Sequence, residues 1–166
     1  MNDSSQTPPQ FSINRFTLAF RPDIEREFQK EHYKKVLPQV QFALLVGICV
    51  YAVFGLLDAF IFPEVKYILW TIRFAGVIPF IMAVYVFSFS SHFIRFVNIA
   101  PAAVILLAGL GIIAMILEAP TPKNSLYYAG LILVLIYGYT FFRIRFIWAT
   151  LTGFLIVIAY EIAAIW

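Results

Sequence analysis

Long apolar runs dominate this sequence and decide what it can fold into. Five of them follow one another, at about 40–62, 67–89, 95–117, 126–142 and 146–166, and the fourth is short. Because a helix needs ~20 mostly apolar residues to cross a bilayer, each run predicts a membrane-spanning helix. Hydrophobic residues make up 62% of the chain and charged residues only 13%, against about 45–50% and about 25% in soluble domains. The sequence therefore predicts an all-α integral membrane protein with five transmembrane helices.

The segment before the first run has a different character. Residues 1–20 begin with the polar stretch "MNDSSQTPPQ", which lacks the basic and apolar regions of a secretory signal, and we expect a flexible cytoplasmic tail. Residues 21–38, "RPDIEREFQKEHYKKVLP", place acidic residues early and lysines late, as helix dipoles favour. We expect an amphipathic cytoplasmic helix on the membrane surface that ends near Pro38, or alternatively a solvated leader helix. Residues 39–166 then form the transmembrane domain.

Basic residues predict the orientation of the spans, because cytoplasmic loops carry an excess of lysine and arginine. Nine such residues fall on the N-terminal side of the predicted membrane and two on the other. The nine are Arg15, Arg21, Arg26, Lys30, Lys34, Lys35, Arg95, Arg143 and Arg145, and the two are Lys66 and Lys123. We therefore expect a cytoplasmic N-terminus, with Lys34, Lys35, Arg143 and Arg145 setting the topology. Five spans from that start leave the last residue outside, so either the protein has five spans or these are five helices of a longer bundle, with a sixth span that returns the chain to the cytoplasm.

Three ionisable residues lie within the predicted spans: Asp58 in the first, Arg73 in the second and Glu161 in the fifth. With the predicted orientation all three fall one or two turns below the outer surface, since a helix rises 1.5 Å per residue. The loop between the first two spans is short, so Asp58 and Arg73 are expected to pair. Charges inside a membrane are expensive and usually face the interior of a bundle at a functional site. We therefore expect Asp58, Arg73 and Glu161 to form an intramembrane polar or ligand-binding site.

A structural interpretation of these charges is equally open. The Asp58–Arg73 pair would then only fix the packing of two helices, and Glu161 would reach towards the outer interface. Tyrosines at the same depth, including Tyr127, are typical of the aromatic belt at a membrane surface. The glycines of the third to fifth spans are typical of close helix packing.

Residue patterns for catalysis or metal binding are missing from the sequence. It contains no glycine-rich phosphate loop, no paired-histidine helix motif and no nucleophile elbow. Its single cysteine, Cys49, lies in an apolar run and is expected to serve packing. The net charge of +3 reflects topology and gives no reason to expect a nucleic-acid partner. We expect no enzyme activity, no cofactor and no metal from this chain.

Several stretches together resemble the N-terminal membrane region of bacterial class III adenylate/guanylate cyclases. They are "FRPDIEREFQKEHY" before the first span, "FGLLDAFIFPE", "LWTIRFAGVIPF" and "YTFFRIRFIWATLTGFLIVIAYE". The resemblance covers about residues 20–166, and it rests most on Asp58, Arg73, the Arg143–Arg145 motif and Glu161. In that family six spans precede a cytoplasmic linker and a catalytic domain that works as a homodimer. This chain has five of the spans and lacks the linker and the catalytic domain.

The resemblance implies a sensory and regulatory membrane-anchoring domain that is non-catalytic by itself. It implies a homodimer in the bacterial inner membrane, with membrane lipid as its surroundings and a small or lipophilic ligand as a further partner. Related membrane regions also precede diguanylate cyclase and histidine kinase outputs, which stay open as alternatives. A small transporter-like or assembly-factor membrane protein, or a plain anchor, is the other alternative.

Overall fold

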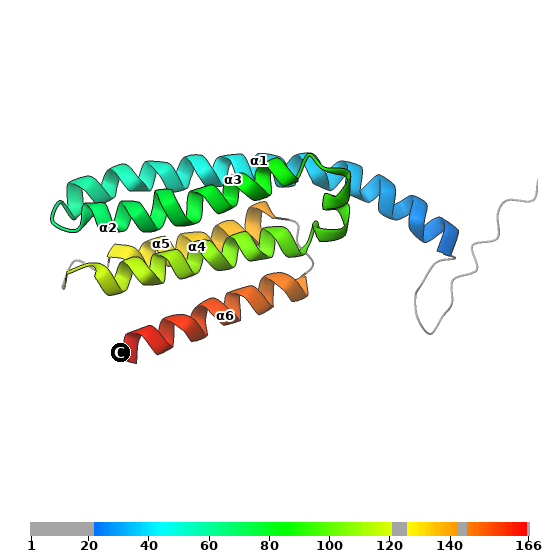
Figure 1. Ribbon diagram of the computed structural model, residues 1–166. Helices are drawn as coiled ribbons and strands as arrows, with labels where there is room; N and C mark the ends of the chain where they lie inside the picture. Colours follow the sequence, from blue (N-terminus) through cyan, green and yellow to red (C-terminus); the bar gives the residue numbers. More distant parts are fainter. Residues whose placement is uncertain (1–21, 121–125, 143–145, 166) are drawn as a thin grey trace, which may run out of the picture. The chain divides into compact units, whose positions relative to one another are not determined.

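The computed structural model describes residues 22–120, 126–142 and 146–165 (Figure 1). The chain divides into two units, Met1–Lys35 and Val36–Trp166, and the site described below lies in the second. The expected tail at 1–20 lies outside the described residues, as do Arg143 and Arg145.

Helices make up all the regular secondary structure of the described residues, which confirms the all-α class for this part of the chain. In chain order the elements are α1 (Pro22–Ile61), α2 (Lys66–Trp70), the π-helical segment η1 (Thr71–Val77), α3 (Ile78–Phe87), the 3-10 helix η2 (Ser91–Phe96), α4 (Ile99–Glu118), α5 (Leu126–Phe141) and α6 (Phe146–Ile165).

Four helices in the described part of the chain are long and apolar enough to cross a membrane, which indicates a membrane protein. They are Val36–Ile61, Lys66–Phe87, Ile99–Glu118 and Ile147–Ile165, and a shorter apolar helix covers Tyr127–Phe141. The third expected run began at residue 95, but the helix begins at Ile99. The reason is local, because the backbone turns through η2 first and the Ser90 side chain accepts a hydrogen bond from the His92 N–H.

Pro38 does not end the first helix, so the expected stop at this residue is wrong. Helix α1 runs without interruption from Pro22 to Ile61, with Pro38 inside it. A proline in a helix removes one N–H donor and crowds the preceding turn, yet packing against other helices compensates for this loss. Val36 and Val40, two residues either side of Pro38, are both buried, and this packing holds the turn in helical geometry.

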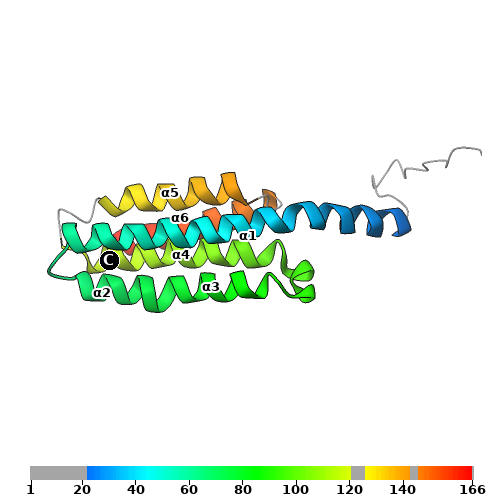
Figure 2. The ribbon, with the colours of Figure 1, turned by 90° about the horizontal axis from the view of Figure 1, so that it is seen from above.

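Helix α4 lies at the centre of the Val36–Trp166 unit. It packs against α2, η1 and α3 on one side and against α5 and α6 on the other, as both views of the ribbon show (Figures 1 and 2). Within the part of α4 that would cross the membrane 56% is buried, compared with 17% for α6. The core of the bundle is therefore built around α4.

Two glycines of α4 permit its close approach to its neighbours. A Cβ atom at Gly109 would lie 2.7 Å from Ile156 Cδ1 of α6, and one at Gly111 would lie 2.6 Å from Val77 Cγ2 of η1. Small residues at helix contacts are typical of membrane bundles, because they let backbones approach. These two positions confirm the packing interpretation of the glycines in this span.

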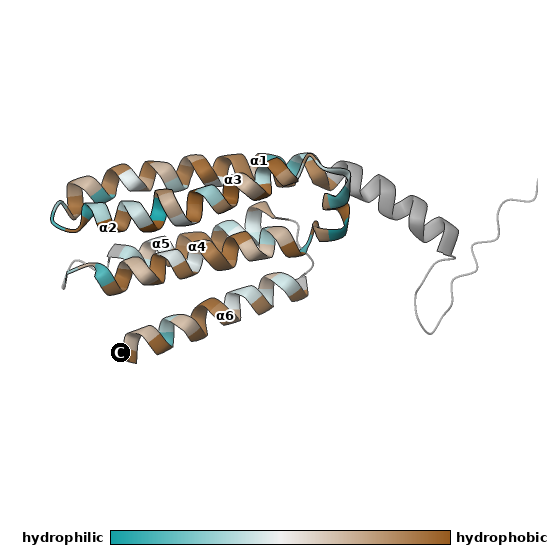
Figure 3. Ribbon diagram, in the orientation of Figure 1, coloured by the Kyte–Doolittle hydropathy of each residue, from teal (hydrophilic) through white to brown (hydrophobic). Residues whose placement is uncertain are grey.

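Apolar residues make up most of the length of the helices (Figure 3), and many large ones are exposed on the outside of the bundle. Large side chains such as Phe60, Ile147 and Ile165 are at least three-quarters exposed. Exposed apolar surface of this extent is unfavourable in water, whereas it costs nothing against lipid chains. The surface therefore agrees with a bundle that sits in a membrane.

Candidate functional site

The Asp58–Arg73 pair predicted from the sequence is present. Arg73 Nε donates to Asp58 Oδ2 over 2.9 Å. Only 4% of Asp58 and 3% of Arg73 is exposed, so both charged side chains are buried inside the bundle. Because an isolated charge in a low-dielectric interior is very costly, each residue makes the burial of the other tolerable.

Arg73 also reaches two other helices. Its Nη1 donates to the Tyr51 carbonyl oxygen of α1 over 3.0 Å, and its Nη2 donates to Met115 Sδ of α4 over 3.5 Å. Its guanidinium carbon lies 4.5 Å from the centroid of the Tyr51 ring, within the range of a cation–π contact. One side chain thus connects η1 to both α1 and α4.

Asp58 completes the arrangement with α5. Tyr127 Oη donates to Asp58 Oδ1 over 2.8 Å, and the Tyr127 ring stacks on Phe62 with a centroid distance of 5.2 Å. The Tyr51 hydroxyl in turn donates to the Ala108 carbonyl oxygen of α4 over 3.3 Å. We call Tyr51, Asp58, Arg73, Met115 and Tyr127 the polar junction, because their side chains and the Tyr51 carbonyl join α1, η1, α4 and α5.

The local backbone around Arg73 explains its position. Arg73 lies in η1, where the Ile78 N–H bonds to the Arg73 carbonyl oxygen, five residues back. Pro79, which has no N–H to donate, follows directly, and π-helical turns of this kind often occur at functional sites. The wider turn changes the direction in which Arg73 points relative to a regular α-helix.

A glycine lets η1 approach α1 at the same level. A Cβ atom at Gly55 would lie 2.8 Å from two atoms of the Phe74 ring and 3.1 Å from Arg73 Cδ. The Gly55 carbonyl oxygen accepts a hydrogen bond from Trp70 Nε1 over 2.8 Å. Gly55 therefore provides the space through which Arg73 reaches Asp58.

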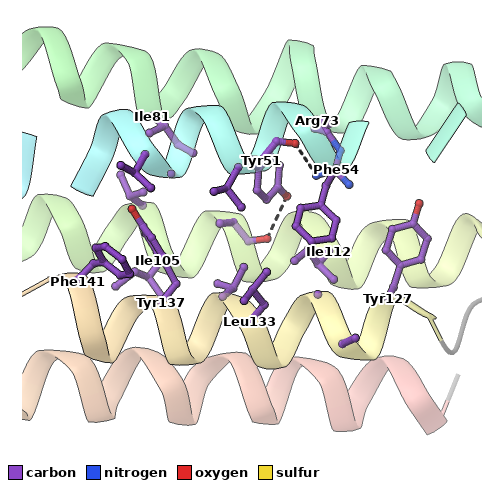
Figure 4. A pocket seen from close by; sticks show the side chains of 18 of the residues that line it. Tyr51, Phe54, Arg73, Ile81, Ile105, Ile112, Tyr127, Leu133, Tyr137 and Phe141 are labelled. Carbon is purple, nitrogen blue, oxygen red and sulfur yellow. Dashed lines mark hydrogen bonds between the residues drawn. The ribbon is translucent and has the colours of Figure 1, made fainter. Parts of the chain in front are cut away.

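An elongated cavity of about 670 Å³ extends from the polar junction between α1, α4 and α5. Figure 4 shows Tyr137 and Phe141 near one end of the cavity and Arg73 and Tyr127 towards the other. Aliphatic side chains such as Ile105, Ile112 and Leu133 line the part between them. Ligand pockets in proteins are typically of this size, largely apolar and equipped with a few polar groups.

Glu161 does not join the junction, so the expectation that its carboxylate faces the bundle interior is wrong. Its side chain is exposed on α6, a helix that packs on α4 and α5. The buried contact of α6 with α4 includes Ile156, and five residues later the helix has turned by about 140°. The charged residue of the fifth run therefore points away from the helix that carries Met115.

Other residues singled out in the sequence lie apart from the junction. Cys49 is exposed on α1 and does not serve the core packing expected of it. Lys34 and Lys35 belong to α1, and their side chains lie outside the described residues. Among the residues that the structure describes, no group of three or more histidine, cysteine, aspartate or glutamate side chains is placed to hold a metal ion.

Three members of the junction, Tyr127, Tyr51 and Met115, were not recognisable from the sequence. Tyr127 has the right depth, but so do several other tyrosines, and the sequence offers no signal that separates it from the aromatic belt. The role of the Tyr51 carbonyl is a backbone contact and carries no residue signature at all. Met115 likewise looks like any apolar residue of its run.

Comparisons with known proteins do not identify a family, so the class of protein follows from the helical bundle and its site. No protein-family model matches the sequence, and no curated protein and no solved structure gives a significant match. The fold and the site define a helical membrane protein with a buried ion pair in the lining of an apolar cavity.

Proposed function

We propose that this chain is the sensory and anchoring membrane domain of a nucleotide cyclase-type signalling protein and is not itself an enzyme. The observation that carries the sensory role is that the cavity ends at the polar junction. A ligand that enters the cavity meets the same side chains that join α1, η1, α4 and α5. Binding can therefore shift the balance between helix arrangements, because a ligand favours whichever arrangement it contacts better.

The cyclase assignment is supported by the resemblance of the four sequence stretches given above. Two of its strongest positions, Asp58 and Arg73, are the two charges of the junction. A transporter-like or assembly-factor membrane protein is the runner-up, and the membrane region of a diguanylate cyclase or a histidine kinase is a further alternative. The apolar lining of the cavity is compatible with each of them.

The proposed topology has five membrane crossings, with α5 as the short fourth crossing. The N-terminus lies in the cytoplasm of a bacterial cell, the chain sits in the inner membrane, and the polar junction lies in the outer half of the bilayer. Arg143 and Arg145 hold the cytoplasmic face. The signalling unit is a homodimer, as in the family that the sequence resembles.

The test uses the whole gene product in a bacterial strain that lacks its own adenylate cyclase. Cyclic AMP, cyclic GMP and cyclic di-GMP are measured for the wild type, for Asp58→Asn and for Glu64→Gln. Glu64 is an exposed loop carboxylate, so its replacement is a matched control that removes a charge away from the junction. We expect one cyclic nucleotide to accumulate, and Asp58→Asn alone to change its level at equal membrane abundance.

A different result would contradict the proposal in a defined way. Absence of cyclic AMP and cyclic GMP rejects the cyclase assignment, and accumulation of cyclic di-GMP alone favours the diguanylate cyclase alternative. An unchanged level in Asp58→Asn rejects the sensory role of the junction. The purified 166-residue chain, given ATP or GTP with Mg²⁺ or Mn²⁺, should form no cyclic product above a protein-free blank. Activity that copurifies with the chain would overturn its non-catalytic role.

A further inference from the structure

Two hydrogen bonds join α5 to α1 along the cavity. At one point Tyr127 Oη donates to Asp58, and at the other Tyr137 Oη donates to the Ala43 carbonyl oxygen. Asp58 and Ala43 are separated by about 22 Å along α1, at 1.5 Å per residue. The two tyrosines thus keep α1 and α5 in register at two distant points and leave an elongated space between them.

Between those two points the cavity reaches the surface of the bundle. Val50 and Leu57 of α1 and Leu133 of α5 all line the cavity, and they are 38%, 45% and 40% exposed. All three are apolar, and they lie within the helices that the lipid would surround. An apolar molecule can therefore enter sideways from the bilayer without crossing a polar surface.

The two charges at the polar-junction end of the cavity neutralise each other. Asp58 and Arg73 are the ionisable acid and base among the described residues that line it, and they neutralise each other. A carboxylate or an ammonium group in this site would have no free counter-charge, and burying such a charge is very unfavourable. The guanidinium group still has N–H groups beyond those used by Asp58, Tyr51 and Met115. An uncharged acceptor oxygen needs no counter-charge and can accept a hydrogen bond from the remaining N–H groups of Arg73.

We propose that the cavity binds a neutral long-chain amphiphile, whose apolar body lies between α1 and α5 and whose uncharged acceptor oxygen bonds to Arg73. This inference rests on the proposed sensory function and names the class of ligand for the same site. The ligand arrives from the membrane and carries an ester, ketone, quinone or hydroxyl oxygen at the end that reaches Arg73. The apolar body supplies most of the binding free energy, and the oxygen supplies the orientation.

The experiment compares probes that differ only at the head. Tritiated methyl palmitate is bound to the purified chain in detergent, and binding is read by scintillation proximity. Unlabelled methyl palmitate, palmitate at neutral pH and hexadecane serve as competitors. We expect the ester to compete at least about tenfold better than either, because palmitate brings an unpaired charge and hexadecane has no oxygen. Equal or better competition by palmitate, equal competition by hexadecane, or no saturable binding of the ester would each overturn the proposal.

Two glycines provide a matched test of the location. Gly130 lines the cavity, and a Cβ atom there would meet only Ile112 Cδ1 at an ordinary 3.6 Å. Gly130→Leu therefore fills the cavity without breaking the junction and should weaken ester binding at least about tenfold. Gly76→Leu makes the same chemical change on η1 where a Cβ atom has no neighbour within 4 Å, and it should bind as the wild type does. Equal binding by the two variants would overturn the assigned site.

The binding data and the signalling data can fail separately. Ester binding that is lost in Gly130→Leu, with a nucleotide level unaffected by Asp58→Asn, supports the ligand class and rejects the signalling role. A nucleotide level that responds to Asp58→Asn, without saturable ester binding, keeps the signalling role and rejects the ligand class.

Discussion

Tyr127 Oη donates to Asp58 Oδ1 over 2.8 Å, although the two residues are 69 positions apart in the chain. The opposite oxygen of the same carboxylate accepts from Arg73 Nε. Asp58 is thus held from two helices at once, and both of its oxygens have a donor. A carboxylate with this arrangement fixes α5 and η1 relative to α1 at a single level of the bundle.

Removing the Tyr127 hydroxyl should weaken the bundle measurably. Tyr127→Phe keeps the ring that stacks on Phe62 and deletes only the hydrogen bond to Asp58. A hydrogen bond to a charged group contributes about 1.5–3 kcal/mol, so the free energy of unfolding should fall by that amount. Titration with SDS in mixed micelles measures it. Tyr128→Phe is the control, because Tyr128 is 43% exposed, and a loss equal to that of Tyr127→Phe would contradict the prediction.

Replacing one partner of the ion pair should lower the free energy of unfolding more than replacing both partners. Arg73→Met leaves Asp58 buried without its cation, which costs about 3–5 kcal/mol in comparable pairs, whereas apolar replacement of both partners is often nearly neutral. We therefore expect Asp58→Leu/Arg73→Met to recover most of the stability that Arg73→Met loses. The same unfolding titration tests it. A double variant less stable than Arg73→Met would show that the pair acts through its other hydrogen bonds.

Contact between α4 and α6 should depend on Gly109. In Gly109→Ala the new Cβ would lie 2.7–3.2 Å from three atoms of Ile156, and Ile156 is fully buried. Overpacking of this kind costs about 1–3 kcal/mol. Ile156→Ala in the same chain removes the opposing atoms and should recover part of the loss. Gly76→Ala, with open space around it, should stay within about 0.5 kcal/mol of wild type.

The proposed orientation can be tested by labelling single cysteines. Cys49, the one native cysteine, is first replaced by alanine. Cysteines are then placed at Glu64, in the loop before α2, and at His92, in η2; both residues are exposed. A membrane-impermeant maleimide applied to intact spheroplasts should label position 64 and leave position 92 unlabelled until the cells are lysed. The reverse pattern would refute the cytoplasmic N-terminus.

Hydropathy determined most of the helical layout of this protein. The apolar runs located four membrane-length helices and the shorter α5, because the need for apolar residues in a span is a local property of each segment. The Asp58–Arg73 pair was also within reach of the sequence, since a short connection forces adjacent helices to be antiparallel and equal depths then bring the two charges together. The predicted helix end near Pro38 was wrong because the effect of a proline on a helix depends on the residues that pack around it.

Only the tertiary structure decided which residues share a site. Glu161 has the same expected depth as Asp58 and Arg73, yet it is exposed on α6, while Tyr127 and Met115 take the contacts that the sequence left open. Depth follows from counting residues along a helix, but the direction of a side chain depends on how each helix is rotated against its neighbours. That rotation is set by contacts such as Gly109 against Ile156 and Gly55 against Phe74, between residues up to 47 positions apart. In a chain that is apolar on nearly every face of its helices, the pattern of residues gives little indication of which face turns inward.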